Sequence, residues 1–307
     1  MPRVALYDDP IYRDHDAGAG HPERPERADA AARGVEAAGL LPRVEKVTPR
    51  DATATEILRV HSEEHLSKVA ESDGTTRRFD ADTQAGPRSY RASLRAAGAG
   101  IDAVDEILDG VFDRAFCIVR PPGHHAGAER AMGFCLFNNV AIAAAHALAQ
   151  GLERVMIVDF DVHHGNGTQA AFYDDDTVFY FSTHEYPHYP GTGAAGERGA
   201  GRGAGFTHNV PLRHGDGDAA LREAWDVTFR ADAAAFRPDC CIVSAGYDLH
   251  ESDPLADLAV SDAGVRGVVR SILGACAGIP VVFALEGGYH LATLARCVGI
   301  TLEELLR

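Results

Sequence analysis

Short apolar runs rich in β-branched residues alternate with longer Ala-rich segments along this chain. That alternation is typical of a parallel sheet whose strands are joined by helices. The expected strands are Val4–Tyr7, Ala115–Arg120, Val155–Asp161, Val178–Ser182, Cys240–Ala245 and Val281–Leu285. The expected helices are Arg24–Ala38, Ser89–Leu108, Asn138–Gln150, Asp218–Phe236 and Asp262–Ala277. The pattern therefore predicts an α/β fold with a central parallel sheet flanked by helices, in one domain over residues 1–307.

Polar residues gather directly after four of the expected strands. They are His124 and His125, Asp161 and His163, Asp248, and Tyr289. In an open parallel sheet the carboxyl ends of the strands share one edge, and ligands bind outside that edge. We therefore expect these side chains to converge on one site.

Composition narrows the class of protein. The net charge of −16 argues against broad nucleic-acid binding, which needs a basic surface. No stretch has the length of a membrane span, and the N-terminal residues lack a signal-peptide pattern, so a cytoplasmic protein without membrane contact is expected. The six cysteines form no C-x-x-C pair, which argues against a zinc finger. The oligomeric state is left open.

The segment that ends in Asp161 and His163 predicts a metal site. Side chains alternate along a strand, so Asp159, Asp161 and His163 share one face. Two buried carboxylates on one face need a cation or hydrogen bonds to offset their charge. Asp248 can supply a third ligand, and such a set leaves positions open for water and substrate. Zn²⁺ is the first choice, and Fe²⁺, Co²⁺ or Mn²⁺ also suit these ligands. The alternative is a hydrogen-bond network without metal.

The paired imidazoles of His124 and His125 follow the turn Pro121–Gly123. Beside a metal-bound water, two imidazoles of different protonation offer a general base and a general acid. Asp159 and Asn166 are the expected partners, a charged one for His124 and a neutral one for His125, and they would push the two pKa values apart. A polar surface turn is the alternative.

Tyr289 stands behind two glycines that let the backbone approach a site closely. A phenol there can donate a hydrogen bond to a substrate carbonyl, an interaction that strengthens as an oxyanion develops. An aromatic side chain after a Gly-Gly turn is otherwise a packing residue.

At these residues the chain resembles the histone deacetylase superfamily, which includes acetoin-utilisation proteins and acetylpolyamine amidohydrolases. The motifs that carry the resemblance are His21–Arg27, Arg120–Ala126, Gly133–Asn139, Asp159–Gln169, Ser244–Asp248 and Glu286–Tyr289. Asn166, where the class I branch has Asp, is similar to the class II-type branch. The resemblance implies the arginase/deacetylase fold, zinc on Asp161, His163 and Asp248, and catalytic roles for the histidine pair and Tyr289.

The resemblance also implies a structural potassium ion. Its ligands would come from the segment that holds the zinc ligands and from the strand after it. The residues concerned are Asp159, Asp161, His163, Ser182 and Thr183.

A narrow acyl-lysine tunnel is a further implication. The substrate-binding residues that it implies are Gly133, Phe134, Tyr189, Leu255 and Gly287. Tyr189 stands where Phe is usual, and Leu255 occupies the position of a gatekeeper at the mouth. Other candidates for the mouth are His184, His188 and His250.

The expected reaction is hydrolysis of an N-acetyl amide by a metal-bound water. Acetyl-lysine on proteins or peptides is the first substrate considered. Acetylpolyamines or other small acetylated amines are the alternative, although the apolar Leu255 argues against them. A non-catalytic acyl-lysine binding module is a further alternative. Such a module would not need the complete set of catalytic residues that this chain retains. A binuclear arginase-type hydrolase would need a second set of carboxylate ligands, which residues 163–166 do not offer.

Overall fold

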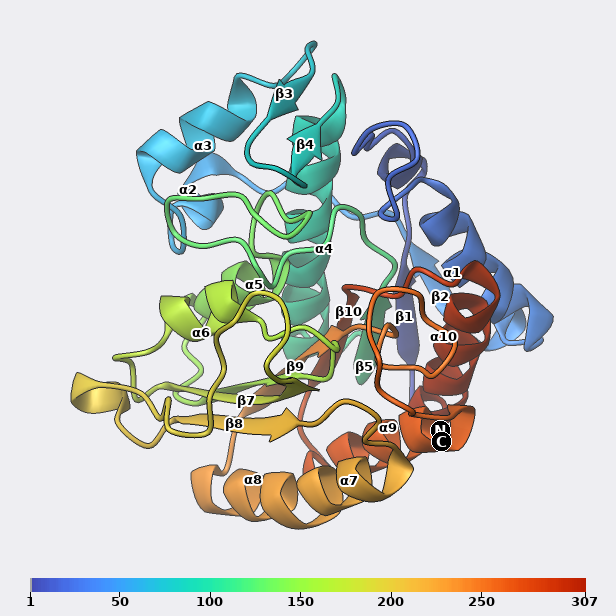
Figure 1. Ribbon diagram of the computed structural model, residues 1–307, viewed down its shortest axis with the longest axis vertical. Helices are drawn as coiled ribbons and strands as arrows, with labels where there is room; N and C mark the ends of the chain where they lie inside the picture. The colour runs from blue at the N-terminus through green and yellow to red at the C-terminus, as the bar shows by residue number, and fades with distance from the viewer. Residues whose placement is uncertain (1) are drawn as a thin grey trace.

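The computed structural model describes residues 2–307 and is built on one eight-stranded parallel sheet (Figure 1). The strands are β1 (Val4–Tyr7), β2 (Glu45–Val47), β5 (Arg114–Cys117), β6 (Val155–Asp159), β7 (Val178–Glu185), β8 (Thr207–Leu212), β9 (Cys240–Ala245) and β10 (Val281–Leu285). Their order across the sheet is β2-β1-β5-β10-β9-β6-β7-β8, and every neighbouring pair is parallel. A small antiparallel ribbon of β3 (Arg77–Arg78) and β4 (Gln84–Ala85) lies apart from it. The predicted fold class is confirmed.

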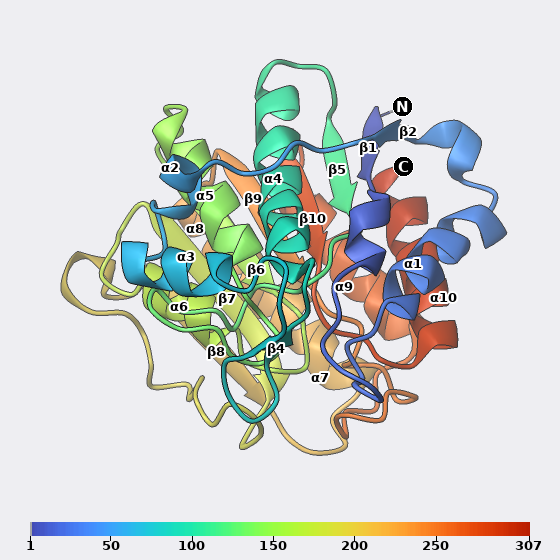
Figure 2. The same cartoon turned by 90° about the horizontal axis from the view of Figure 1, so that it is seen from above.

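Helices cover both faces of the sheet, as Figure 2 shows. On one face lie α4 (Ser89–Leu108) and α5 (Asn139–Ala149), which pack on each other and on the central strands. On the other face lie α1 (Glu26–Ala37), α9 (Asp262–Ala275), α10 (Leu291–Leu305), and α7 (Asp218–Glu223) followed by α8 (Arg230–Phe236). The shorter helices are α2 (Ala54–Ile57), α3 (Glu63–Ala70) and α6 (Asn166–Ala171).

Burial on both faces explains why the strands read as continuous apolar runs. Every residue of β6, β9 and β10 is buried. A parallel sheet covered by helices on both sides has no solvent face, so its strands do not alternate apolar with polar residues. The core formed in this way fixes where each strand ends, and therefore where the polar residues emerge.

Several predicted boundaries differ from the structure. The strand expected over Ala115–Arg120 runs from Arg114 to Cys117, because the backbone then turns and Val119 N–H donates to the carbonyl of Cys117 at 3.0 Å. The strand expected to end at Asp161 ends at Asp159, so Asp161 and His163 lie beyond it. The strand expected to end at Ser182 continues to Glu185. The helix expected over Asp218–Phe236 contains a π-helical segment, Ala224–Phe229, between α7 and α8.

Besides the short helices α2, α3 and α6 and the β3–β4 ribbon, the elements that were not predicted are the edge strands β2 and β8 and the helix α10. Within residues 2–307, no helix combines the length and the apolar character that crossing a membrane requires. All six cysteines are buried free thiols.

Candidate active site

The predicted site residues emerge from four adjacent strands, β5, β10, β9 and β6, at their carboxyl ends. The histidine pair follows β5, and Tyr289 follows β10. Asp248 follows β9, while Asp161 and His163 follow β6. Because neighbouring strands lie about 4.8 Å apart, four consecutive exits place all these side chains within reach of one another.

Two carboxylates and one imidazole form a buried cluster at this edge. His163 Nδ1 lies 3.1 Å from Asp161 Oδ1 and 3.2 Å from Asp248 Oδ2. One ligand atom from each of the three residues lies within 4.8 Å of the others. These are the three residues that the sequence predicts as metal ligands.

The surroundings of the cluster fit a divalent ion. Asp248 Oδ2 is buried and has no hydrogen-bond partner among residues 2–307. The pKa of Asp248 is raised to about 7, because the carboxylate is buried and because the negative charge of Asp161 repels it. A side chain on Gly246 or Gly287 would collide with the carboxylates, so the glycines leave the space around them open. A cation would neutralise this charge and occupy the unpartnered oxygen.

The two imidazoles are held in different protonation states. His124 Nδ1–H donates to Asp159 Oδ2 at 3.0 Å, and His125 Nδ1–H donates to Asn166 Oδ1 at 2.8 Å. Burial lowers the pKa of His124, but the charge of Asp159 and its neighbours outweighs burial and raises it to about 10. Burial and the charge of His124 hold the pKa of His125 well below its usual value. At neutral pH the first ring is charged and the second is neutral.

A buried carboxylate without a predicted role, that of Glu286, supports the histidine turn. Glu286 accepts the backbone N–H of Gly123 at 2.6 Å and that of His124 at 3.1 Å. Burial raises the pKa of Glu286 to about 7. The carboxylate therefore ties the end of β10 to the turn after β5. Its place directly after an apolar strand is the sequence signal that could have indicated this.

Tyr289 is held by groups from both ends of the chain. Its backbone N–H donates to Asp253 Oδ2 at 2.6 Å, and the Arg27 guanidinium lies 4.9 Å from the centroid of its ring. Arg27 is fully buried, pairs with Glu23 at 3.0 Å, and donates to the carbonyl of Gly288 at 2.7 Å. Burial holds the pKa of Tyr289 well above its usual value, so the phenol keeps its proton.

A cavity of about 240 Å³ leads to this cluster. Its lining residues are Asp82, His125, Gly133, Phe134, His163, His188, Tyr189, Leu255 and Tyr289. Gly287, predicted to bind substrate, does not line it, because the residue lies beneath the carboxylates and donates its N–H to Asp161 Oδ2 at 2.8 Å. Asp82, in the β3–β4 loop, was not predicted.

Of the three histidines considered for the mouth, only His188 lines the cavity. His184 lies buried between Ser182 Oγ and the carbonyl of Gly193, each 2.8 Å from one of its ring nitrogens. His250 points to Asp262 at 3.0 Å.

The chain is similar to known proteins over nearly its whole length. The model of the histone deacetylase domain matches residues 21–305. The chain belongs to the histone deacetylase family. Histone deacetylase 15 of Arabidopsis thaliana is 41% identical over 295 residues, which cover 93% of this chain and 53% of that protein. Polyamine deacetylase HDAC10 of Homo sapiens is 39% identical over 299 residues, covering 92% of this chain and 44% of that protein. The chain therefore spans about half the length of these two relatives.

A solved structure of this family has the same fold. The crystal structure of the HDA15 HD domain superposes with a TM-score of 0.94 at 39% identity, and the match covers 100% of this chain and 90% of that one. The resemblance noted in the sequence is thereby confirmed, and so is the fold that it implies.

Of the residues that the family resemblance implies for potassium, Asp159 lies on β6, Asp161 and His163 follow it, and Ser182 and Thr183 lie on β7. Asp159 and Ser182 are register partners on these strands. Ser182 Oγ contacts His184 Nδ1, and Thr183 Oγ1 accepts the indole N–H of Trp225 at 3.2 Å. The potassium ion stays a prediction.

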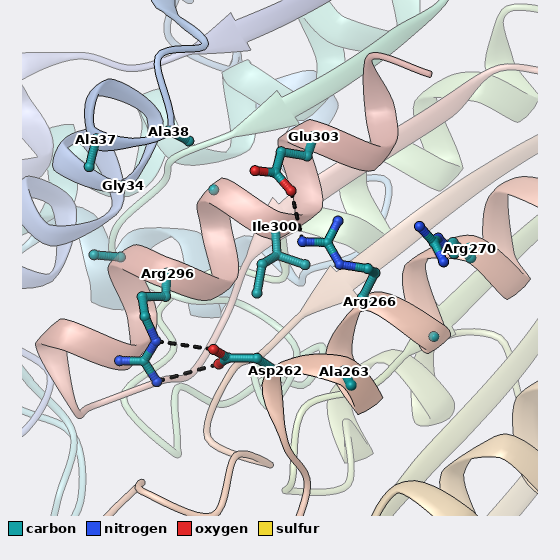
Figure 3. A pocket seen from close by; sticks show the side chains of 13 residues that line it. Gly34, Ala37, Ala38, Asp262, Ala263, Arg266, Arg270, Arg296, Ile300 and Glu303 are labelled. Atoms are coloured by element: carbon teal, nitrogen blue, oxygen red, sulfur yellow. Dashed lines mark hydrogen bonds and ion pairs between the residues drawn. The ribbon is translucent and has the colours of Figure 1, made fainter.

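A larger hollow of about 660 Å³ lies away from the catalytic edge, between α1, α9 and α10 (Figure 3). Its charged side chains pair with one another. Arg296 pairs with Asp262 at 3.2 Å, and Arg266 pairs with Glu303 at 2.7 Å. Both pairs join α9 to α10.

Proposed function

We propose that this histone deacetylase family member hydrolyses an N-acetyl amide, with acetyl-lysine on proteins or peptides as the first substrate. The observation that carries the proposal is a pair of imidazoles, one hydrogen-bonded to a carboxylate and the other to an amide, beside a cluster of metal-ligating groups. Tyr289 faces the same cavity as His125 and His163. This arrangement supports amide hydrolysis rather than a silent binding module, which has no need for differently protonated bases.

Asp161, His163 and Asp248 would hold the divalent ion, and Zn²⁺ is the ion that we propose. When bound there, such an ion polarises a substrate carbonyl and lowers the pKa of a coordinated water. The chain's own part is to place the three ligands and to leave part of the coordination sphere open toward the cavity.

Proton transfer is assigned to His125. Its Nδ1–H is committed to Asn166, so its Nε2 lone pair is free to accept a proton from the attacking water. The same ring can then pass that proton to the leaving nitrogen. His124 does not line the cavity, and it keeps its charge through Asp159. The two rings were expected to share the roles of base and acid, whereas exposure to the cavity favours His125 for both transfers.

Tyr289 would stabilise the oxyanion that forms from the carbonyl. A phenol with a raised pKa remains a donor at neutral pH, and its ring lies edge-on to Phe134 with centroids 5.9 Å apart. The hydroxyl is therefore directed by packing as well as by the backbone bond to Asp253. Donors fixed before the reaction need no reorganisation when the charge appears.

A second candidate substrate is an acetylated polyamine. The apolar Leu255 at the cavity favours an acyl-lysine side chain, whereas the Asp82 carboxylate at the same cavity would attract a cationic amine. One of the two relatives named above is a histone deacetylase by name and the other a polyamine deacetylase. Membership of the family therefore does not decide between the two substrate classes.

The test is a comparison of kcat/KM for an acetyl-lysine peptide and for acetylspermidine. We expect the peptide to be preferred, and we expect Asp82→Asn to reduce only the polyamine rate. Leu255→Glu should shift the ratio toward acetylspermidine, since it adds a carboxylate beside the path of the amine. No turnover of either substrate by the metal-loaded chain would contradict the hydrolytic function.

A further inference from the structure

The ring of His125 is held by an amide and not by a carboxylate. His125 Nδ1 lies 2.8 Å from Asn166 Oδ1, and this is the one hydrogen bond of the ring within residues 2–307. An amide has a donor end and an acceptor end, whereas the Asp159 carboxylate that faces His124 can only accept. An Asn166 amide turned the other way would present its NH₂ group to the ring, and the ring proton would then lie on Nε2. The direction of this amide therefore decides which nitrogen of His125 is protonated.

The thioether of Met132 faces the other end of the same amide. Asn166 Nδ2–H donates to Met132 Sδ at 3.4 Å, and Arg130 Nη2–H donates to the same sulfur at 2.7 Å. A thioether sulfur carries no hydrogen, so it can accept a hydrogen bond but cannot donate one. It therefore attracts the NH₂ end of Asn166 and disfavours the oxygen, which is left to face His125.

Met132 is held in place by its own backbone. The residue is buried, and its N–H and carbonyl pair with the carbonyl and N–H of Cys135 at 3.2 and 3.0 Å. The next residue, Gly133, packs directly against the imidazole of His125, because a side chain at that position would collide with the ring. Residues 132–135 therefore contact both the ring and the amide that decides its tautomer.

We infer that Met132 is a positioning residue, which selects the Nδ1–H tautomer of His125 through the Asn166 amide. The inference rests on the proposed function, in which His125 is the base. With the ring proton on Nδ1, the Nε2 lone pair is free to accept a proton from water. With the ring proton on Nε2, that nitrogen has no lone pair to offer. The sulfur thus acts on proton transfer without touching the substrate.

NMR of the ring nitrogens measures the tautomer without any need for turnover. The full chain is labelled with ¹⁵N-histidine, supplied with Zn²⁺ and studied at pH 8 by two-bond ¹H–¹⁵N correlation, which distinguishes the protonated ring nitrogen from the unprotonated one. The His125 signals are identified by their loss in His125→Gln. We expect Nδ1–H in the unaltered chain. We expect a mixture of both tautomers in Met132→Leu, because leucine has a similar volume but no acceptor.

Further variants separate the effect of the sulfur from a general disturbance of packing. Met132→Gln restores an acceptor, the side-chain carbonyl, and should return the ring to Nδ1–H. Asn166→Asp replaces the amide by a group that accepts through either oxygen, so adding Met132→Leu to it should leave the tautomer unchanged. The matched control is Met156→Leu, at a buried methionine of β6, which should keep Nδ1–H. Pure Nδ1–H in Met132→Leu would overturn the inference, and so would a tautomer change that persists in the Asn166→Asp background.

Kinetics connect the tautomer to the proposed function. Met132→Leu should lower kcat for an acetyl-lysine peptide by about 2–10-fold, the factor that corresponds to one neutral hydrogen bond, with little change in KM. Met132→Gln should recover most of that loss. A tautomer change in the spectra with an unchanged kcat would support the positioning by Met132 and contradict the role of His125 as the base. The two ideas can therefore fail separately.

Discussion

The guanidinium of Arg27 lies over the ring of Tyr289, 4.9 Å from its centroid, and both side chains are buried. Arg27 comes from α1, and Tyr289 follows β10. The same guanidinium pairs with Glu23, which also pairs with Arg120 at 2.5 Å. Arg27 and Arg120 thus share the fully buried carboxylate of Glu23, and this pairing holds the Arg27 guanidinium against the ring of Tyr289.

Replacing Arg27 should therefore destabilise the fold and displace the phenol. Arg27→Met removes one of the two cations that pair with buried Glu23, and breaking a buried pair costs about 3–5 kcal/mol. Urea denaturation of the metal-loaded protein measures the loss. Arg33→Met, at an exposed position of the same helix, should change stability by less than about 0.5 kcal/mol. Equal midpoints for the two variants would refute the role given to Arg27.

Tyr289→Phe should lower kcat by about 10²–10³-fold, which is the usual cost of removing one oxyanion donor. The ring and its packing on Phe134 are retained, so folding and metal content should be unchanged. Steady-state kinetics with an acetyl-lysine peptide gives the answer. A kcat within a few-fold of the unaltered enzyme would rule out oxyanion stabilisation by this hydroxyl.

Asp161→Ala should abolish metal binding at the catalytic cluster. Asp161 supplies one of three ligands, and its loss leaves one carboxylate and one imidazole. Elemental analysis after dialysis against a weak chelator measures occupancy, and the comparison is with Asp105→Ala, which removes a carboxylate on α4 far from the cluster. Full metal content in Asp161→Ala would contradict the ligand set.

Gly287→Ala should weaken metal binding although it adds only a methyl group. That group would collide with the carboxylates of Asp248 and Asp161. Gly267→Ala is the control, because that glycine lies in α9 with open space around it, and alanine there should stabilise the helix by up to about 1 kcal/mol. Metal titration of both variants tests the difference. Unaltered affinity in Gly287→Ala would mean that the carboxylates can move aside.

His61 should make stability depend on pH. Burial, helped by the nearby His65, lowers the pKa of His61 to about 3 and outweighs the hydrogen bond from its Nδ1–H to the carbonyl of Gly127, which raises it. The Nε2 atom accepts the N–H of Asn138 at 2.9 Å. The unfolded chain takes up a proton near pH 6.5, so the contribution is complete above pH 6.5 and is lost as the pH falls toward 3.

The stability difference between the unaltered chain and His61→Gln should therefore shrink by about 1.4 kcal/mol for each pH unit below 6.5. Denaturation curves at several pH values between 4.5 and 7.5 provide the measurement. A difference that stays constant over this range would show that His61 is not neutral in the folded protein.

Sequence reasoning was most successful where burial is strongest. β1, β9 and β10 have the predicted bounds, because continuous apolar runs leave one place for each strand to begin and end. The site residues follow such strands, so the sheet edge on which they meet could be predicted from the pattern alone.

The edges of the sheet could not be predicted in this way. Glu45 and Lys46 of β2 are exposed, and β8 contains a proline, so neither strand has an apolar pattern that distinguishes it from a loop. Asp82 reaches the cavity only because the β3–β4 loop folds back over it, a long-range contact without a local signal. Nothing in the local sequence indicates that Arg27 is buried, because arginine side chains are usually exposed.

The parallel order of the sheet also governs when the protein can first act during its synthesis. Arg27, on α1, is synthesised early. Tyr289 follows β10 and is synthesised only near the end of the described chain. A nascent polypeptide that already carries both imidazoles still lacks the hydroxyl and the strand that separates β5 from β9. The candidate site is therefore incomplete until β10 and Tyr289 have been added to the chain.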